Sequence, residues 1–307
     1  MANFANTPDV QALLDKLSGA DQTGGDARLK AVVRRIMGDL FATIDEFDLT
    51  DDEIWGALNY AAAGSDEYGL WAAGLGLERY LDMRADAIDA AHGITGGTPR
   101  TIEGPLYVAG APESTGFARL DDGTDDGKGE VLIMHGQVRD MDGTPIPNAK
   151  VEVWHANTLG NYSYFDQTQS AFNLRRSIYT DDEGRYAFRS VVPVGYACPP
   201  NGSTEGILKA IGRHGNRPAH IHFFVSSHHH RHLTTQINID GDPYLHDDFA
   251  YATRDELIPT INHIGDSNLG AKYGVTGRFA EIEFDFTLHA TNVETEEEAS
   301  TRLRAAA

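Results

Sequence analysis

The feature that most limits the possible folds of this chain is a change in the spacing of its apolar residues near residue 97. Before this point, apolar side chains recur at every third or fourth position, which is the period of an amphipathic helix. Beyond it, short segments alternate apolar and polar residues, which is the period of a strand. The sequence therefore predicts an α+β protein, with a helical domain over residues 1–96 and an antiparallel β-sandwich over residues 97–307.

The clearest helical stripe runs over residues 29–47. Thr50 and Glu53 have the spacing of a capping box that opens the next helix. A break at residues 64–65 precedes a third apolar helix, expected at about residues 70–91. The stripe has two interpretations: it packs between helices as a core, or it forms a dimer face or a groove for an apolar ligand.

The sandwich is predicted from short alternating segments that are separated by turns such as Asp142-Gly143 and Asp240-Gly241. The last segment, over residues 279–288, alternates most regularly and is expected to be one strand. The Glu-rich tail beyond Val293 is expected to be a short helix. The other expected strands are 130–138, 149–154, 177–180, 186–192, 219–225 and 234–239.

The composition excludes several classes of protein. A net charge of −21 and a pI near 4.8 argue against nucleic-acid and anionic-membrane partners, because both would repel this surface. The single cysteine, Cys198, rules out an intramolecular disulfide and a cysteine-rich zinc site. No apolar run is long enough to span a bilayer, and the first residues lack the pattern of a secretory signal. We therefore expect a cytoplasmic protein without membrane insertion.

His220 and His222 are the strongest chemical signal that the residues themselves provide. On a strand, residues two apart share a face with Cα atoms about 6.5 Å apart. Two imidazoles at this spacing can bind one metal at about 2.1 Å, while Ile221 points into the core. The alternative is a pair of surface histidines on a polar strand face.

The spacing does not identify the metal. A zinc hydrolase needs a third histidine or a carboxylate, and a ferrous facial triad needs His-x-Asp or His-x-Glu, which does not stand out nearby. The histidine-rich segment 228–232 is expected to be a solvated hairpin loop and not the catalytic centre. With 12 tyrosines in the chain, spacing alone cannot select phenolate ligands.

Motifs along the chain resemble those of the intradiol ring-cleaving dioxygenases. The resemblance extends from the first helices to about residue 290, with the motifs in the family's order, and is greatest to the members that cleave catechol. The motifs are TPRTIEGPLY at 98–107, VWHAN at 153–157, PVGYACPP at 193–200, GNRPAHIH at 215–222 and LTTQI at 233–237.

This resemblance implies a non-haem Fe(III) ion, one per subunit. Carried over by position, its ligands are Tyr162, Tyr196, His220 and His222, with a solvent hydroxide as the fifth. Two phenolates and a hydroxide balance the charge of a ferric ion, and a strongly acidic metal is needed to deprotonate a phenol at neutral pH. Tyr196 is the ligand expected to leave the metal and to accept a proton from the substrate.

The activity implied by the resemblance is the cleavage of catechol by O₂ to cis,cis-muconate, a step of aromatic degradation. Arg217 is expected to place a positive charge beside the ring, and Gln236 to bond near a substrate oxygen. The structural alternatives are an ion pair for Arg217 and a hydrogen bond along the sheet for Gln236. Hydroxyquinol, chlorocatechols or methylcatechols are alternative substrates. A zinc or cupin-like hydrolase and a non-catalytic prealbumin-like module are more remote alternatives.

The family's substrate-pocket positions are mostly small and apolar here, which suits an unsubstituted ring. Ala73 replaces a larger residue of some relatives and leaves room for a substituent. The resemblance also implies a homodimer formed through the helical domain, with a phospholipid bound there. The pocket positions are Leu70, Ala73, Ile102, Pro105, Leu106, Phe249 and Ala250.

Overall fold

The structure is a computed structural model that describes residues 4–125, 127–291 and 304–306. Contacts divide the chain into two compact units, Met1–Ser65 and Asp66–Ala307. The helix expected beyond Val293 lies outside the described residues.

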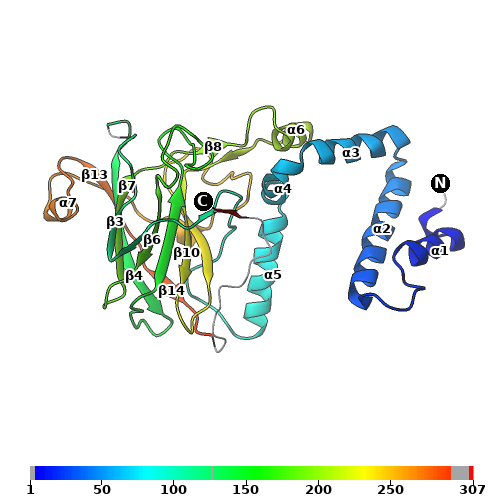
Figure 1. Ribbon diagram of the computed structural model, residues 1–307, viewed down its shortest axis with the longest axis horizontal. Coiled ribbons are helices and arrows are strands. Elements are labelled where there is room, and N and C mark those ends of the chain that lie inside the picture. The colour runs from blue at the N-terminus through cyan, green and yellow to red at the C-terminus, as the bar shows by residue number, and fades with distance from the viewer. Residues whose placement is uncertain (1–3, 126, 292–303, 307) are drawn as a thin grey trace. The chain divides into compact units, whose positions relative to one another are not determined.

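The first unit is helical, as expected. It contains the 3-10 helix η1 (Phe4–Asn6) and the helices α1 (Pro8–Leu17), α2 (Ala27–Phe47) and α3 (Asp51–Ala63) (Figure 1). The predicted capping box is present at the start of α3: the Thr50 hydroxyl accepts from the Glu53 N–H, and the Glu53 carboxylate accepts from the Thr50 N–H. Neither these helices nor any other helix among the described residues has the length and apolar composition to cross a membrane.

Part of the apolar stripe of α2 is exposed. No residue of this helix is buried, and Leu29, Ile36 and Phe47 expose 61%, 60% and 68% of their surface. The interpretation as packed core is therefore wrong for these residues, whereas Val33, Met37, Phe41 and Ile44 of the same stripe are half-buried. An exposed apolar stripe of this length is typical of a surface that binds a partner or an apolar ligand, so the second interpretation stays a prediction.

The second unit begins with helices and continues into the sheets. The 3-10 helix η2 (Ser65–Glu67) leads into α4 (Tyr68–Gly74) and α5 (Leu77–Ala91), and α5 lies beside the strands in Figure 1. The prediction of one helix over residues 70–91 was wrong, because the chain breaks between α4 and α5. Gly76 has a φ of 79°, a left-handed conformation that glycine adopts without strain.

Two sheets form the sandwich, and most of their pairs are antiparallel, so the α+β class is confirmed. The other strand pairs of these two sheets are parallel. The first sheet has the order β11 (Leu233–Asn238), β10 (His220–Ser226), β5 (Lys150–His155), β6 (Arg175–Tyr179), β2 (Glu113–Thr115). The second has the order β12 (Asn262–Ile264), β13 (Phe279–Glu283), β4 (Val131–Asp140), β7 (Arg185–Val191), β3 (Phe117–Arg119), with β14 (Phe286–Leu288) also on β4.

Shorter elements complete the second unit. Two small sheets pair β1 (Val108–Ala109) with β15 (Ala305–Ala306) and β8 (Tyr196–Ala197) with β9 (Asn216–Arg217). The remaining helices are α6 (Ser203–Ala210), η3 (Asp255–Leu257) and α7 (Asn268–Lys272).

The single strand expected over residues 279–288 is wrong, because β13 and β14 are separate strands. The Phe284 carbonyl accepts a hydrogen bond from the Tyr186 hydroxyl at 2.7 Å, and the Asp285 carboxylate accepts one from the Gln137 N–H at 2.8 Å. The Asp285 side chain thus occupies the backbone N–H of Gln137 on β4. A continuous strand would have paired its own backbone with that N–H group. Alternation of residue type does not reveal this interruption.

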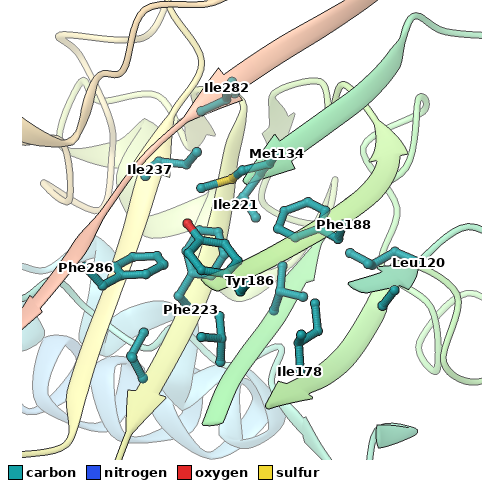
Figure 2. Packing of buried hydrophobic residues seen from close by; sticks show 14 of the residues in the cluster. Leu120, Met134, Ile178, Tyr186, Phe188, Ile221, Phe223, Ile237, Ile282 and Phe286 are labelled. Carbon is teal, nitrogen blue, oxygen red and sulfur yellow. The ribbon is translucent and has the colours of Figure 1, made fainter. Parts of the chain in front are cut away.

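The main core lies between the two sheets. Ile221, Phe223 and Val225 point into it from β10 with no exposed surface, as predicted for Ile221. Figure 2 shows Phe223 beside Phe286 of β14, with ring centroids 5.0 Å apart. Because successive strand residues point to opposite faces, His220 and His222 lie on the face of β10 that is turned away from this core.

Candidate metal centre

A row of buried side chains crosses the first sheet on this face. The register pairs His222 with Gln236 on one side and with Trp154 on the other, and pairs Trp154 with Arg175. Cross-strand partners point to the same face of a sheet, so the four side chains lie side by side. The Trp154 ring stacks on the His222 imidazole at 4.9 Å and 6°, which fixes the orientation of this histidine.

His220 and His222 converge as their spacing predicted. Each is 1% exposed, and their Nε2 atoms are 3.0 Å apart. Two nitrogens that each bind one metal at about 2.1 Å can be no more than about twice that distance apart, so this separation suits a shared ion. The alternative of two surface histidines is wrong.

The structure brings both candidate tyrosines to this pair. The Tyr162 hydroxyl lies 3.3 Å from His220 Nε2. The Tyr196 ring centroid lies 5.4 Å from that of Tyr162 and 5.6 Å from that of His220. Tyr196 reaches the site because β8 pairs it with Arg217, three residues before His220. A turn built on Asn157, whose side chain accepts the N–H groups of residues 159 and 161, precedes Tyr162.

The protonation of these groups fits a metal site. His220 Nδ1 lies 2.7 Å from the Pro218 carbonyl, which assigns the proton to Nδ1 and the lone pair to Nε2. Burial and the charge of Arg217 lower the pKa of His220 to about 3, so the imidazole is neutral, the form that binds metals. Arg217 Nη1 lies 3.0 Å from the same Nε2, a contact that a cation bound there would replace.

Burial raises the pKa of the Tyr162 hydroxyl well above its usual value. The phenolate therefore forms only beside a strongly acidic cation. Two neutral imidazoles and two phenols fit a trivalent ion better than zinc, because two phenolates balance a higher charge. Within the described part of the chain, no group of three or more His, Cys, Asp or Glu side chains could hold a metal.

Arg217 and Asp248 form a buried ion pair beside the histidines. Arg217 donates from Nε and Nη2 to the two carboxylate oxygens at 3.1 and 3.0 Å, and from Nη2 to Gln236 Oε1 at 2.9 Å. Burial opposes the charge of Asp248, but Arg217 outweighs it and lowers the pKa of this carboxyl. Asp248 was missed by sequence reasoning, because no spacing connects it to the histidine motif.

The expected pocket residues gather in two neighbouring apolar clusters. Leu106 packs with Tyr162 and Trp154. Pro105 approaches Gly69 on α4, where a Cβ would lie 2.8 Å from the proline ring. One cluster contains Leu70, Ala73, Ile102, Phe249 and Ala250, together with Cys198 and Leu208, which the sequence did not single out.

The segment that carries Ile102, Pro105 and Leu106 also reaches the candidate metal centre. A Cβ on Gly104 would lie 3.7 Å from the His222 ring. The apolar residues and the donor atoms thus meet on one side of the first sheet.

The histidine-rich segment 228–232 connects β10 with β11. Arg231 in this loop pairs with Asp89 of α5 at 2.8 Å. The segment is a hairpin loop, as expected, and it does not join the donor cluster.

Comparison with known proteins agrees with this geometry. Residues 102–290 match the family model described as dioxygenase, and residues 26–93 match the model described as catechol dioxygenase N terminus. The chain is 62% identical to catechol 1,2-dioxygenase 2 of Acinetobacter lwoffii, over 83% of this chain and 93% of that protein. This chain belongs to the intradiol dioxygenase family. The family is known to use non-haem iron.

A solved catechol 1,2-dioxygenase from Acinetobacter sp. ADP1 superposes with a TM-score of 0.94 at 52% identity, covering 99% of each chain. A hydroxyquinol 1,2-dioxygenase of a Rhizobium species is more distant, at 32% identity over 93% of this chain and 96% of that protein. The family therefore divides by substrate, and this chain is more similar to the catechol branch.

Proposed function

We propose that this protein is an Fe(III)-dependent intradiol dioxygenase that cleaves catechol with O₂ to cis,cis-muconate. The observation that carries the proposal is the convergence of two buried imidazoles and two phenols in one place, with the His220 and His222 Nε2 atoms 3.0 Å apart. The similarity to relatives named catechol 1,2-dioxygenase supports the choice of diol.

In this proposal Tyr162, Tyr196, His220 and His222 hold one iron per subunit. The bound ion supplies a Lewis-acidic centre that chelates the diol and makes its ring reactive toward O₂. Tyr162 is 4% exposed and lies in the interior, which suits a permanent ligand.

Tyr196 has the second role of accepting a substrate proton at its phenolate oxygen. It is less buried than Tyr162, and it lies on a strand of only two residues. Both features support a ligand that moves when the diol binds. A phenolate oxygen beside the bound diol is a suitable base for this transfer.

Arg217 and Gln236 orient the site around the ring. The bidentate contact with Asp248 holds the Arg217 guanidinium in a fixed position, and Arg217 in turn binds the Gln236 side chain. Arg217 then presents N–H groups toward the negative charge that develops on the substrate, and Gln236 donates near a substrate oxygen. Because both groups are fixed before the substrate binds, little reorganisation is needed during the reaction.

The pocket formed by Leu70, Ala73, Ile102, Phe249 and Ala250, closed by Pro105 and Leu106, holds the ring. Its apolar lining favours catechol over hydroxyquinol, because a third hydroxyl would be buried without a partner. The small Ala73 leaves room for a methyl or chloro group, so substituted catechols are secondary substrates.

We further propose that residues 1–96 act as a linker and dimerisation domain that precedes the catalytic domain at 97–307. The exposed stripe of α2 supports a homodimer and the binding of a phospholipid-like amphiphile there. The compartment that this proposal assigns is the cytoplasm.

The test is turnover of catechol under air by the iron-loaded protein, with O₂ uptake and the ring-opened product measured together. We expect one O₂ consumed per cis,cis-muconate formed. A product opened outside the two hydroxyl-bearing carbons would contradict the intradiol assignment. A strong preference for hydroxyquinol would overturn the choice of diol, and activity in a colourless, zinc-loaded protein would overturn the iron site.

A further inference from the structure

A second buried arginine, Arg175, lies at the start of β6 and is 1% exposed. It donates from Nε to the Ser163 hydroxyl at 2.9 Å, from Nη1 to the Leu106 carbonyl at 2.8 Å and from Nη2 to the Ser163 carbonyl at 3.0 Å. All three acceptors are neutral. Among the residues that the structure describes, no carboxylate forms an ion pair with this guanidinium.

The two arginines near the candidate metal centre therefore differ in charge balance. Arg217 is neutralised by its bidentate contact with Asp248, whereas Arg175 contributes a net positive charge. A guanidinium keeps its charge at neutral pH, so the buried Arg175 is a cation. A buried charge without a counter-charge is costly, so an anion is expected beside it.

Two tyrosines are near enough to supply that anion. Tyr107 donates its hydroxyl proton to the Glu152 carboxylate at 2.9 Å and so remains a phenol. Tyr162 lies with its ring centroid 5.8 Å from the Arg175 guanidinium carbon. Arg175 also holds the backbone and side chain of Ser163, the residue that follows Tyr162. Its charge is therefore fixed relative to the Tyr162 ring.

We propose that Arg175 is a positioning residue of the metal centre, whose guanidinium is fixed beside the Tyr162 ring and acts electrostatically on the phenolate that Tyr162 forms when it binds the metal. This inference rests on the proposed function, because it requires Tyr162 to be a ligand. The positive charge lowers the energy of the filled phenolate orbitals, which makes electron transfer from the phenolate to a ferric ion more costly. Through its bonds to Ser163, the residue that follows Tyr162, Arg175 also fixes the backbone beside this ligand.

The test compares the visible spectra of iron-loaded wild-type protein and of the variants Arg175→Gln and Arg175→Lys. Phenolate-to-iron charge transfer gives a band in this region. We expect Arg175→Gln to shift the band to longer wavelength and to weaken iron binding, measured by competition with a chelator, by roughly 10- to 100-fold. Arg175→Lys keeps the charge, and we expect its band to lie close to that of the wild type.

Two further variants separate charge from structure. Arg176→Gln removes the same charge from the next residue of β6, which points to the other face and donates to the Arg119 carbonyl. Ser163→Ala keeps the charge of Arg175 and removes one of its hydrogen bonds. We expect no band shift in either. If Arg175→Gln does not fold, Ser163→Ala serves as the test. A shift of its band to longer wavelength would assign the band position to the hydrogen bond and not to the charge, and would overturn the proposal.

An unshifted band in folded Arg175→Gln, or an equal shift in Arg175→Lys, would also overturn it. These outcomes leave the proposed function intact, because the wild-type protein would still be coloured and would still cleave catechol. A wild-type protein without a visible band and without turnover would instead remove the proposed function and the inference together.

Discussion

The apolar stripe of α2 and the histidine face of β10 are equally regular in the sequence, yet they have opposite surroundings in the folded chain. Ile36 of the stripe exposes 60% of its surface, whereas His220 and His222 are each 1% exposed. Exposing apolar groups to water costs free energy unless a partner covers them, and burying polar groups costs free energy unless they are hydrogen-bonded or bind an ion. The exposed residues of the helix support the proposed binding of a partner or an apolar ligand, and the buried imidazole pair of the strand supports the proposed metal site.

The largest expected effect is on the strand. His222→Ala removes a proposed metal donor, and we expect catechol turnover to fall by more than roughly 100-fold while the far-ultraviolet circular dichroism stays unchanged. The core face of β10, formed by Ile221 and Phe223, is untouched by this change. His228→Ala in the exposed loop is the matched control and should keep wild-type turnover. Near-wild-type activity in His222→Ala would remove this residue from the site.

Tyr196→Phe separates proton transfer from metal binding. The ring and its packing stay, but the hydroxyl that serves as ligand and base is lost, and we expect turnover to fall by about 10²- to 10⁴-fold. The visible band of the iron-loaded protein should persist with lower intensity, because Tyr162 still binds. Tyr179→Phe, at the end of β6, is the control. Unchanged turnover in Tyr196→Phe would assign the base to another group.

Asp248→Asn tests whether buried polar groups of the site depend on one another. We expect about 3 kcal/mol loss in the free energy of unfolding, measured with urea, because the Arg217 charge is left buried without its partner. The adjacent Asp247→Asn changes an exposed carboxylate, with a side chain 80% exposed, and should cost less than about 0.5 kcal/mol. Equal losses in both variants would contradict a special role for the buried pair.

The same carboxyl makes stability depend on pH. Its pKa is lower in the folded than in the unfolded chain, so the unfolded chain binds more protons below about pH 4. The stability due to Asp248 is therefore complete above that pH and is lost as the pH falls through the folded pKa. Urea midpoints measured from pH 6 downward should decline more steeply for the wild type than for Asp248→Asn. Parallel declines would show that the pair does not contribute.

The smallest expected effect on turnover is on the helix. Ile36→Glu places a charge on the exposed stripe, and we expect turnover to change by less than about twofold, while self-association measured by sedimentation weakens. Ala42→Glu adds the same charge to α2 on another side of the helix and should leave association unchanged. A loss of turnover in Ile36→Glu would show that the stripe affects the catalytic unit.

Features that depend on residues close together in the sequence could be predicted, and features that depend on residues far apart in the sequence could not. The period of apolar residues predicted α2, α3, the longer strands of both sheets and the shared face of His220 and His222, because these depend on neighbours along the chain. The short strands and the helices α6 and α7 were not predicted. The break at Gly76 and the interruption at Phe284 were missed, because they depend on contacts with distant segments. Asp248 was missed for the same reason, and the convergence of Tyr162 and Tyr196 was expected only from family resemblance.

The most direct test of a ferric site that binds the diol is the visible spectrum of the purified protein, recorded without O₂ before and after catechol is added. We predict a broad charge-transfer band from the phenolates, which shifts to longer wavelength as catechol binds the metal. A colourless protein, or a band that catechol leaves unchanged although turnover occurs under air, would contradict the account.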